Sequence, residues 1–64
     1  MRVIPVDQYD AEGNLTKIIF QGEDGEDKLD AIWDERDEQT SENRVAFRTW
    51  SYEAARRAGF EVDK

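Results

Sequence analysis

Hydrophobic positions along the chain fall into short groups that polar and glycine-rich segments separate. The first two groups are residues 2–9 (RVIPVDQY) and 15–22 (LTKIIFQG), which are rich in the β-branched and aromatic residues that favour strands. Between them, Asp10 and Gly13 occupy the first and fourth positions of a favourable type I turn, and Gly13 can take the left-handed conformation that closes a short loop. The pattern therefore predicts a β-hairpin over residues 2–21.

The hairpin register follows from a test of which pairing makes one face apolar. Setting Tyr9 opposite Leu15 places Asp7 opposite Lys17, an opposite-charge cross-strand pair of about 0.2–1 kcal/mol. One face then carries four apolar side chains, which we predict as the core: Ile4, Val6, Ile18 and Phe20. The other face carries three more, which we predict as a candidate interface: Val3, Leu15 and Ile19.

The middle of the chain is predicted as an acidic loop followed by a short helix, together spanning residues 22–36. The loop is the glycine-punctuated stretch GEDGEDK. Leu29, Ile32 and Trp33 follow at spacings i, i+3 and i+4, which are typical of one helical face, so we expect a helix from about Asp27 to Arg36.

A longer amphipathic helix is predicted over residues 41–58. Ser41 is a suitable N-cap, and Gly59 is suited to end the helix in the left-handed conformation. The apolar stripe has helical spacing and consists of Phe47, Trp50, Ala54 and Ala58. Residues 60–62 alternate as a short third strand, which we expect beside the second strand because Pro5 cannot donate to a ladder on the first. The predicted fold class is a small single α+β domain, with Trp33, Phe47, Trp50 and Phe60 filling its core.

Charge is distributed unevenly along the chain. The net charge is −7, and 39% of the residues are charged. Residues 1–22 carry two bases and three acids, residues 23–42 carry two bases and ten acids, and residues 43–64 carry five bases and three acids. The net charges are therefore −1, −8 and +2, so the acidity belongs to the middle third.

Several functional classes are disfavoured by residue content. Histidine and cysteine are absent, which removes the usual base near neutral pH, the thiolate nucleophile and the commonest metal ligands. We expect no enzymatic activity, no cofactor and no dedicated metal site, since neither Gly25 nor Gly13 aligns with an EF-hand loop. Direct nucleic-acid binding needs clustered bases, which the negative charge disfavours.

The chain also has no apolar run near the ~20 residues of a membrane span, and its N-terminus does not read as a signal peptide. We therefore expect a cytoplasmic protein, including one that acts in the cytoplasm of a host cell, without membrane association.

The acidic segment is the leading candidate site. Its carboxylates could imitate a phosphate backbone, because a row along a helix repeats every ~5.4 Å. The expected partner is a protein with a basic groove that handles nucleic acid, as in the analogy of small acidic phage proteins that inhibit or modulate host factors. The candidate partner-binding residues are Asp24, Glu26, Asp27, Asp30, Asp34, Glu35, Asp37, Glu38 and Glu42. The alternative interpretation of the acidic segment is a solvated face that only keeps a small protein soluble.

The alternative function is a structural or assembly protein that acts through apolar contacts. In that case Val3, Leu15 and Ile19 would form a homodimer or dock on a larger complex. The two hypotheses differ in salt dependence, because exposed charge pairs are screened by salt and apolar contacts are not.

Overall fold

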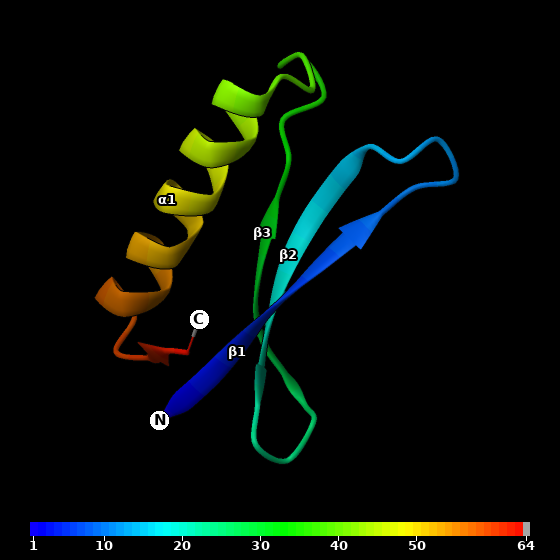
Figure 1. The fold of residues 1–64 in the computed structure, drawn as a ribbon. Helices are drawn as coiled ribbons and strands as arrows, with labels where there is room; N and C mark the ends of the chain where they lie inside the picture. The colour runs from blue at the N-terminus through cyan, green and yellow to red at the C-terminus, as the bar shows by residue number, and fades with distance from the viewer. Residues whose placement is uncertain (64) are drawn as a thin grey trace.

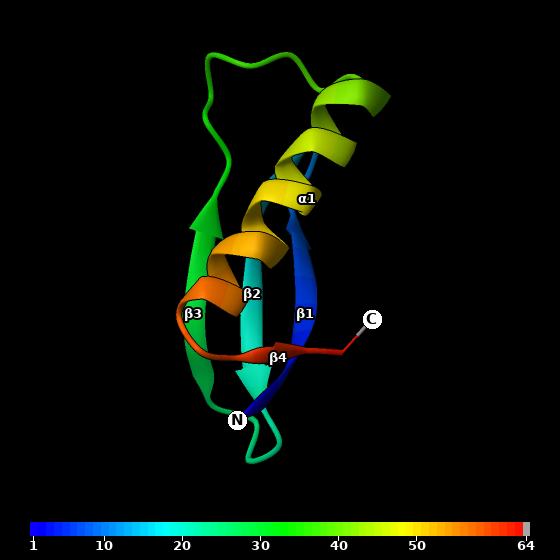
Figure 2. The same ribbon diagram turned by 90° about the vertical axis from the view of Figure 1, so that its left-hand side faces the viewer.

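The computed structural model describes residues 1–63, and in this part of the chain four strands and one helix are formed. They are β1 (Arg2–Tyr9), β2 (Leu15–Gly22), β3 (Asp27–Ile32), α1 (Ser41–Arg57) and β4 (Glu61–Val62). The strands make one sheet in the order β3-β2-β1-β4, in which β4 runs parallel to β1 and the other neighbours are antiparallel. Helix α1 lies across one face of the sheet, and no other described element covers the opposite face (Figures 1 and 2). The predicted α+β class is confirmed, but with one helix instead of two.

The turn between β1 and β2 forms as predicted. The Asp10 amide donates to the Asn14 carbonyl at 2.9 Å, and the Gly13 amide donates to the Asp10 carbonyl at 3.1 Å. Gly13 has a φ of 85°, a left-handed conformation that glycine adopts without strain. Tyr9 pairs with Leu15, as the register test predicted.

Beyond that first pair, the predicted hairpin register is wrong by one residue. The register shifts between Gln8 and Tyr9, so Gln8 faces Lys17 and Asp7 faces Ile18. A one-residue slip exchanges the faces of a strand. Pro5 therefore faces Phe20 on the side of the helix, and the predicted Asp7–Lys17 pair does not form. The cause is that residues 3–6 are all apolar, so alternation could not distinguish the two faces of β1.

The core lies between the sheet and α1. Its buried cluster is Val3, Ile18, Phe20, Ala31 and Ala55, with Leu29, Phe47, Tyr52, Phe60 and Val62 packed against it. Ile18 and Phe20 are thus in the core as predicted, whereas the register slip moves Val3 inward and leaves Ile4 half-exposed on the open face. Trp33 is buried, but Trp50, also predicted for the core, is half-exposed.

Residues 27–36 do not form the predicted short helix. Residues Asp27–Ile32 are strand β3, which pairs with β2 from Lys17↔Ile32 to Gln21↔Asp27. Leu29, Ala31 and Trp33 also have the period of two that strands require, and these side chains turn toward the core while Asp30 and Ile32 stay exposed. Short apolar runs fit both periods, and pairing with β2 decided between them.

Helix α1 matches the predicted range to within one residue, but its cap and its buried face differ. Thr40 is the N-cap instead of Ser41, and its hydroxyl accepts the Asn43 amide at 3.0 Å. Gly59 follows the helix with a φ of 97°, as predicted. The most buried helix positions are the small residues Ser51 and Ala55, which allow the helix to approach the sheet closely.

The short final strand β4 forms, but beside β1 and not beside β2. The Glu61 amide donates to the Met1 carbonyl and the Asp63 amide to the Val3 carbonyl, each at 2.9 Å. These contacts lie at the start of β1, away from Pro5, and β3 already occupies the free side of β2. Pro5 therefore did not prevent Arg2 and Val3 of β1 from pairing with β4.

Candidate functional site

The predicted acidic residues lie in two groups at opposite ends of β3 and not in one helical row. The turn acids, Asp24, Glu26 and Asp27, lie at the β2–β3 turn, and the loop acids, Asp34, Glu35, Asp37 and Glu38, lie in the loop between β3 and α1 (Figure 1). The six residues of β3 separate the groups by about 20 Å. Only Asp30 lies between them, and Glu42 is in the first turn of α1 next to the loop.

The turn acids contact several nearby groups, of which Lys28 is the base. Lys28 Nζ lies 3.2 Å from Asp24 Oδ2 and 3.5 Å from Glu26 Oε2. The Glu26 amide donates to the Asp24 carboxylate at 3.0 Å, and this bond followed by the Lys28 ammonium lowers the pKa of Asp24. Asp27 accepts from the Gln21 side-chain amide at 3.1 Å.

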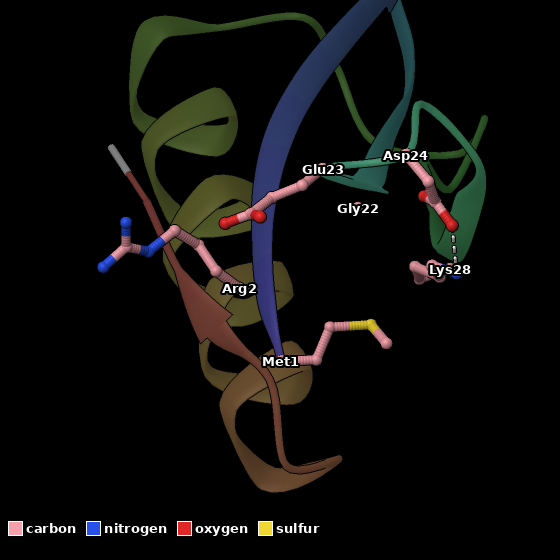
Figure 3. A pocket seen from close by; sticks show the side chains of 6 residues that line it. All are labelled: Met1, Arg2, Gly22, Glu23, Asp24 and Lys28. Carbon is pink, nitrogen blue, oxygen red and sulfur yellow. Dashed lines mark hydrogen bonds and ion pairs between the residues drawn. The ribbon is translucent and has the colours of Figure 1, made fainter.

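A depression beside this turn carries charges of both signs (Figure 3). Arg2 and Lys28 line it together with Glu23 and Asp24. This depression therefore presents two bases as well as two acids.

Asp30 projects from the middle of β3 toward the face that α1 leaves open. Its carboxylate lies 4.0 Å from Lys17 Nζ of the neighbouring strand. This is a cross-strand charge pair of the kind that contributes little at an exposed position.

The loop acids are paired to a smaller extent. Asp34 accepts from the Arg36 guanidinium at 3.1 and 2.9 Å and from the Arg36 amide at 3.0 Å, and these bonds lower the pKa of Asp34. In the described part of the chain, no Lys or Arg nitrogen lies within 4.0 Å of the carboxylates of Glu35, Asp37, Glu38 or Glu42. These exposed carboxylates form the larger group without close countercharge, since by the same criterion only Glu23 and Asp27 lack a close base at the turn in the described residues.

The loop that carries these acids is held in place by hydrogen bonds to β2 and to residues close to it along the chain. Gln39 pairs with the backbone of Leu15: its side-chain oxygen accepts the Leu15 amide at 3.1 Å, and its nitrogen donates to the Leu15 carbonyl at 2.9 Å. The Trp33 indole donates to the Asp37 carbonyl at 3.2 Å, and Asn43 donates to the Glu38 carbonyl at 2.9 Å. The exposed carboxylates therefore project from a backbone with several fixed points.

Asp10 belongs to the same end of the molecule, although the sequence did not identify it. The β1–β2 turn lies near the β3–α1 loop, and Asp10 lines a depression together with Glu35 and Asp37, in which Lys17 is the only base. Backbone amides of its own turn, that of Asn14 first, lower the pKa of Asp10 and keep its carboxylate charged. Sequence reasoning assigned Asp10 only a turn role, because the loop that approaches it lies more than twenty residues away.

Of the bases of α1, Arg44 lies at this end and contacts the loop backbone, whereas Arg48 contacts β1. The Arg44 guanidinium donates to the Gln39 carbonyl, and Arg48 pairs with Asp7 of β1 on the side of the sheet that faces the helix. Arg56 and Arg57 lie in the last turn of α1, at the opposite end of the helix from the loop.

The three residues predicted as an apolar interface are separated by the fold. Val3 is fully buried in the core and Leu15 is buried, with its backbone held by Gln39. Only Ile19 lies on the open face, where it is 8% exposed between Val6 and Asp30. The predicted surface of Val3, Leu15 and Ile19 is therefore wrong as one surface. The exposed apolar residues of the open face are Ile4 and Ile32.

Within residues 1–63, no three acidic side chains are grouped so as to hold a metal ion. In the same residues, no helix combines the length and the apolar character that crossing a bilayer requires.

Comparisons with models of protein families, with curated proteins and with solved structures found no match to this chain. Function is therefore inferred from the surface of the molecule itself.

Proposed function

We propose that this protein is a non-enzymatic inhibitor or modulator that presents its loop acids to a basic surface of a nucleic-acid-binding protein. The observation that supports this most is the set of exposed carboxylates without close countercharge on a hydrogen-bonded loop: Glu35, Asp37, Glu38 and Glu42, with Asp10 beside them. A phosphate-binding groove is rich in Lys and Arg, so this cluster has the charge that such a groove selects.

The physical advantage of the loop is preorganisation. Binding a flexible acidic tail requires ordering it, which opposes association. Here Gln39 and Trp33 fix the loop backbone before any partner arrives. Uncompensated carboxylates also accelerate encounter with a basic surface, and that effect weakens as salt rises. The mimicry is of a clustered negative charge and not of the regular helical row that the sequence suggested.

The test uses two variants with the same change of net charge at opposite ends of the domain. The loop variant is Glu35→Gln, Asp37→Asn, Glu38→Gln, and the turn variant is Asp24→Asn, Glu26→Gln, Asp27→Asn. Wild type and both variants are immobilised, exposed to nuclease-treated lysate and washed with increasing salt. Each captured protein is then purified and tested for binding to DNA or RNA with and without added wild-type protein.

We expect the wild type and the turn variant to capture a nucleic-acid-binding protein that salt releases and whose nucleic acid the wild type displaces. The loop variant should fail to capture it. Equal capture by all three proteins, or capture without competition against nucleic acid, would contradict the proposal.

The open face of the sheet supports a second candidate, an assembly protein that associates through apolar contacts. Ile4 is 50% exposed and Ile32 is 71% exposed on a face without a covering element among the described residues. Sedimentation velocity at increasing concentration tests for a homodimer. Ile4→Lys should abolish it, whereas Val45→Lys on α1 should not. A wild type that stays monomeric at the highest concentration removes this candidate.

A further inference from the structure

A groove runs between α1 and the end of β3. Four helix residues at spacings i, i+3, i+4 and i+7 line its helical side: Asn43, Ala46, Phe47 and Trp50. Ile32 of β3 and the start of the following loop line the other side. The groove is therefore part of the same end of the molecule as the loop acids.

A ladder of aromatic rings connects the core to the groove, which Phe47 and Trp50 line. The Trp33 and Phe47 rings meet edge to face with centroids 5.1 Å apart, and the Phe47 and Trp50 rings follow at 6.0 Å. Trp33 is buried, Phe47 is half-buried, and Trp50 is 52% exposed, so the ladder leads from the core to the surface. Large exposed aromatic side chains beside other apolar groups are typical of protein-binding surfaces.

The rim of the groove is negative. Asp34 and Asp37 line it, and no Lys or Arg does. Asp34 is paired with Arg36, whereas the Asp37 carboxylate has no base within 4.0 Å in the described part of the chain. An apolar floor with a negative rim is complementary to an apolar side chain that has a basic neighbour.

The adjacent edge of the sheet is also free. β3 is the outermost strand, and the Trp33 amide donates inward to the Thr16 carbonyl of β2 at 2.9 Å. In an antiparallel pair the backbone groups of successive residues alternate in direction. Those of Ile32 and Asp30 therefore point outward, where an extended chain can pair with them.

We propose that this groove binds an extended segment of a protein partner, in which an aromatic or aliphatic side chain stands next to Lys or Arg. The apolar side chain packs on Trp50 and Phe47, and the neighbouring base approaches Asp37. This inference rests on the proposed function, since it assigns the loop acids and the groove to the same basic partner. It adds an apolar anchor, so salt should release the partner from the wild type at a higher concentration than from a form without that anchor.

The test is selection of peptides from a random display library on three forms of the full chain: wild type, Trp50→Ala and Val45→Ala. Val45 is an exposed apolar residue of α1 that does not line the groove, which makes it the matched control. Circular dichroism and urea unfolding verify that each form is folded. The most enriched peptide is then synthesised, and its Kd for each form is measured at low and high salt.

We expect peptides selected on wild type and Val45→Ala to share an apolar residue adjacent to Lys or Arg, and we expect Trp50→Ala to weaken binding at least about tenfold, or 1.4 kcal/mol. Basic peptides without an apolar residue, bound equally by Trp50→Ala, would overturn the groove but leave the acidic site intact. Apolar peptides without Lys or Arg would overturn the basic partner and the proposed function with it. Failure to select any peptide on wild type over Trp50→Ala would overturn the groove.

Discussion

The two ends of β3 have similar acidic sequences but different structures. The turn of residues 22–27 is closed by hydrogen bonds between near neighbours: the Gly25 amide donates to the Gly22 carbonyl at 3.0 Å, and the Gly22 amide donates to the Glu26 carbonyl at 2.9 Å. The loop of residues 33–40 is held by Leu15, which lies 24 residues from Gln39 along the chain. One end is organised locally and the other by tertiary contacts.

The same contrast holds for charge. At the turn, Lys28 contacts Asp24 and Glu26, whereas Glu23 and Asp27 have no Lys or Arg nitrogen within 4.0 Å among the described residues. In the loop, Arg36 contacts only Asp34 and leaves the other carboxylates without a close base. The density of acids along the sequence thus does not show which carboxylates have a close countercharge, because that depends on where the bases lie in space.

The largest effect is expected from removing the core anchor of the loop. Trp33→Ala should lower the free energy of unfolding by about 3–5 kcal/mol, because Trp33 is buried against Phe47 and donates to the Asp37 carbonyl. Urea denaturation followed by circular dichroism measures this. Trp33→Phe, which keeps an aromatic ring but loses the indole donor, should cost less. A loss below about 1 kcal/mol for Trp33→Ala would show that the loop end does not depend on this anchor.

Replacing the glutamine at either end of β3 should lower the free energy of unfolding by a smaller amount. Gln39→Ala removes two part-buried hydrogen bonds to Leu15 and should cost about 1–3 kcal/mol. Gln21→Ala removes one exposed bond to Asp27 and should change stability by less than about 0.5 kcal/mol. Urea denaturation gives both values, and amide hydrogen exchange should accelerate at Leu15 in the first variant only. Equal costs would contradict the distinction between a tertiary and a local end.

Backbone conformation should matter at the turn. Gly25 has a φ of 80° with open space around its Cα, so Gly25→Ala adds left-handed strain without a steric clash. We expect a loss of about 1–2 kcal/mol in urea denaturation. Gly25→Asn should lose less, because asparagine tolerates this conformation. If alanine and asparagine are equally harmful, the left-handed requirement is not the reason.

The smallest effects are expected in carboxylate titration. The side chain of Arg36 is the leading cause of the lowered pKa of Asp34, whereas a backbone amide is the leading cause for Asp24 and Lys28 comes second. Arg36→Gln should therefore raise the pKa of Asp34 more than Lys28→Gln raises that of Asp24. Carboxyl-detected NMR titration measures both. A larger rise at Asp24 would reverse the assigned causes.

The lowered pKa values of Asp34 and Asp24 also determine how the stability of the fold changes with pH. A carboxylate whose pKa is lower in the folded state contributes stability above its unfolded pKa, and this contribution is lost as the pH falls through the folded pKa. Wild-type stability should therefore decrease on acidification below about pH 4. Arg36→Gln should make this decrease shallower. A steeper decrease in the variant would contradict the pairing of Asp34 with Arg36.

The sequence predicted local structure correctly where neighbouring residues decide the backbone conformation. The Asp10–Gly13 turn and helix α1 with its terminal Gly59 were predicted within a residue or two, because turn residues, caps and a long helical stretch act over short distances. The α+β class followed from these elements. The acidic candidates were named from the sequence without their surroundings, which include the contacts of Lys28 with two turn acids and the position of Asp10 beside the loop.

The pairing of strands far apart in the sequence could not be predicted in the same way. Residues 27–32 fit a helical and an extended period equally well, and the apolar run of residues 3–6 fits both faces of a strand. In each case the free energy that selects one conformation comes from contact with β2 or α1. Trp50 illustrates the same limit: helical spacing placed it with Phe47, but the sheet packs against Ser51 and Ala55 and leaves its ring half-exposed.

By itself the sequence determined the charge of this protein, its first turn, its helix and the number of acidic residues in its middle third. Those properties depend on composition and on residues a few positions apart. Only the tertiary structure decided that residues 27–32 form a strand and that the two acidic groups lie at its opposite ends. It also decided that Gln39 holds the loop that carries one group, while Lys28 contacts two acids of the other. The reason is that strand pairing and countercharge are made between residues far apart in the chain, and their energies exist only after the chain has folded.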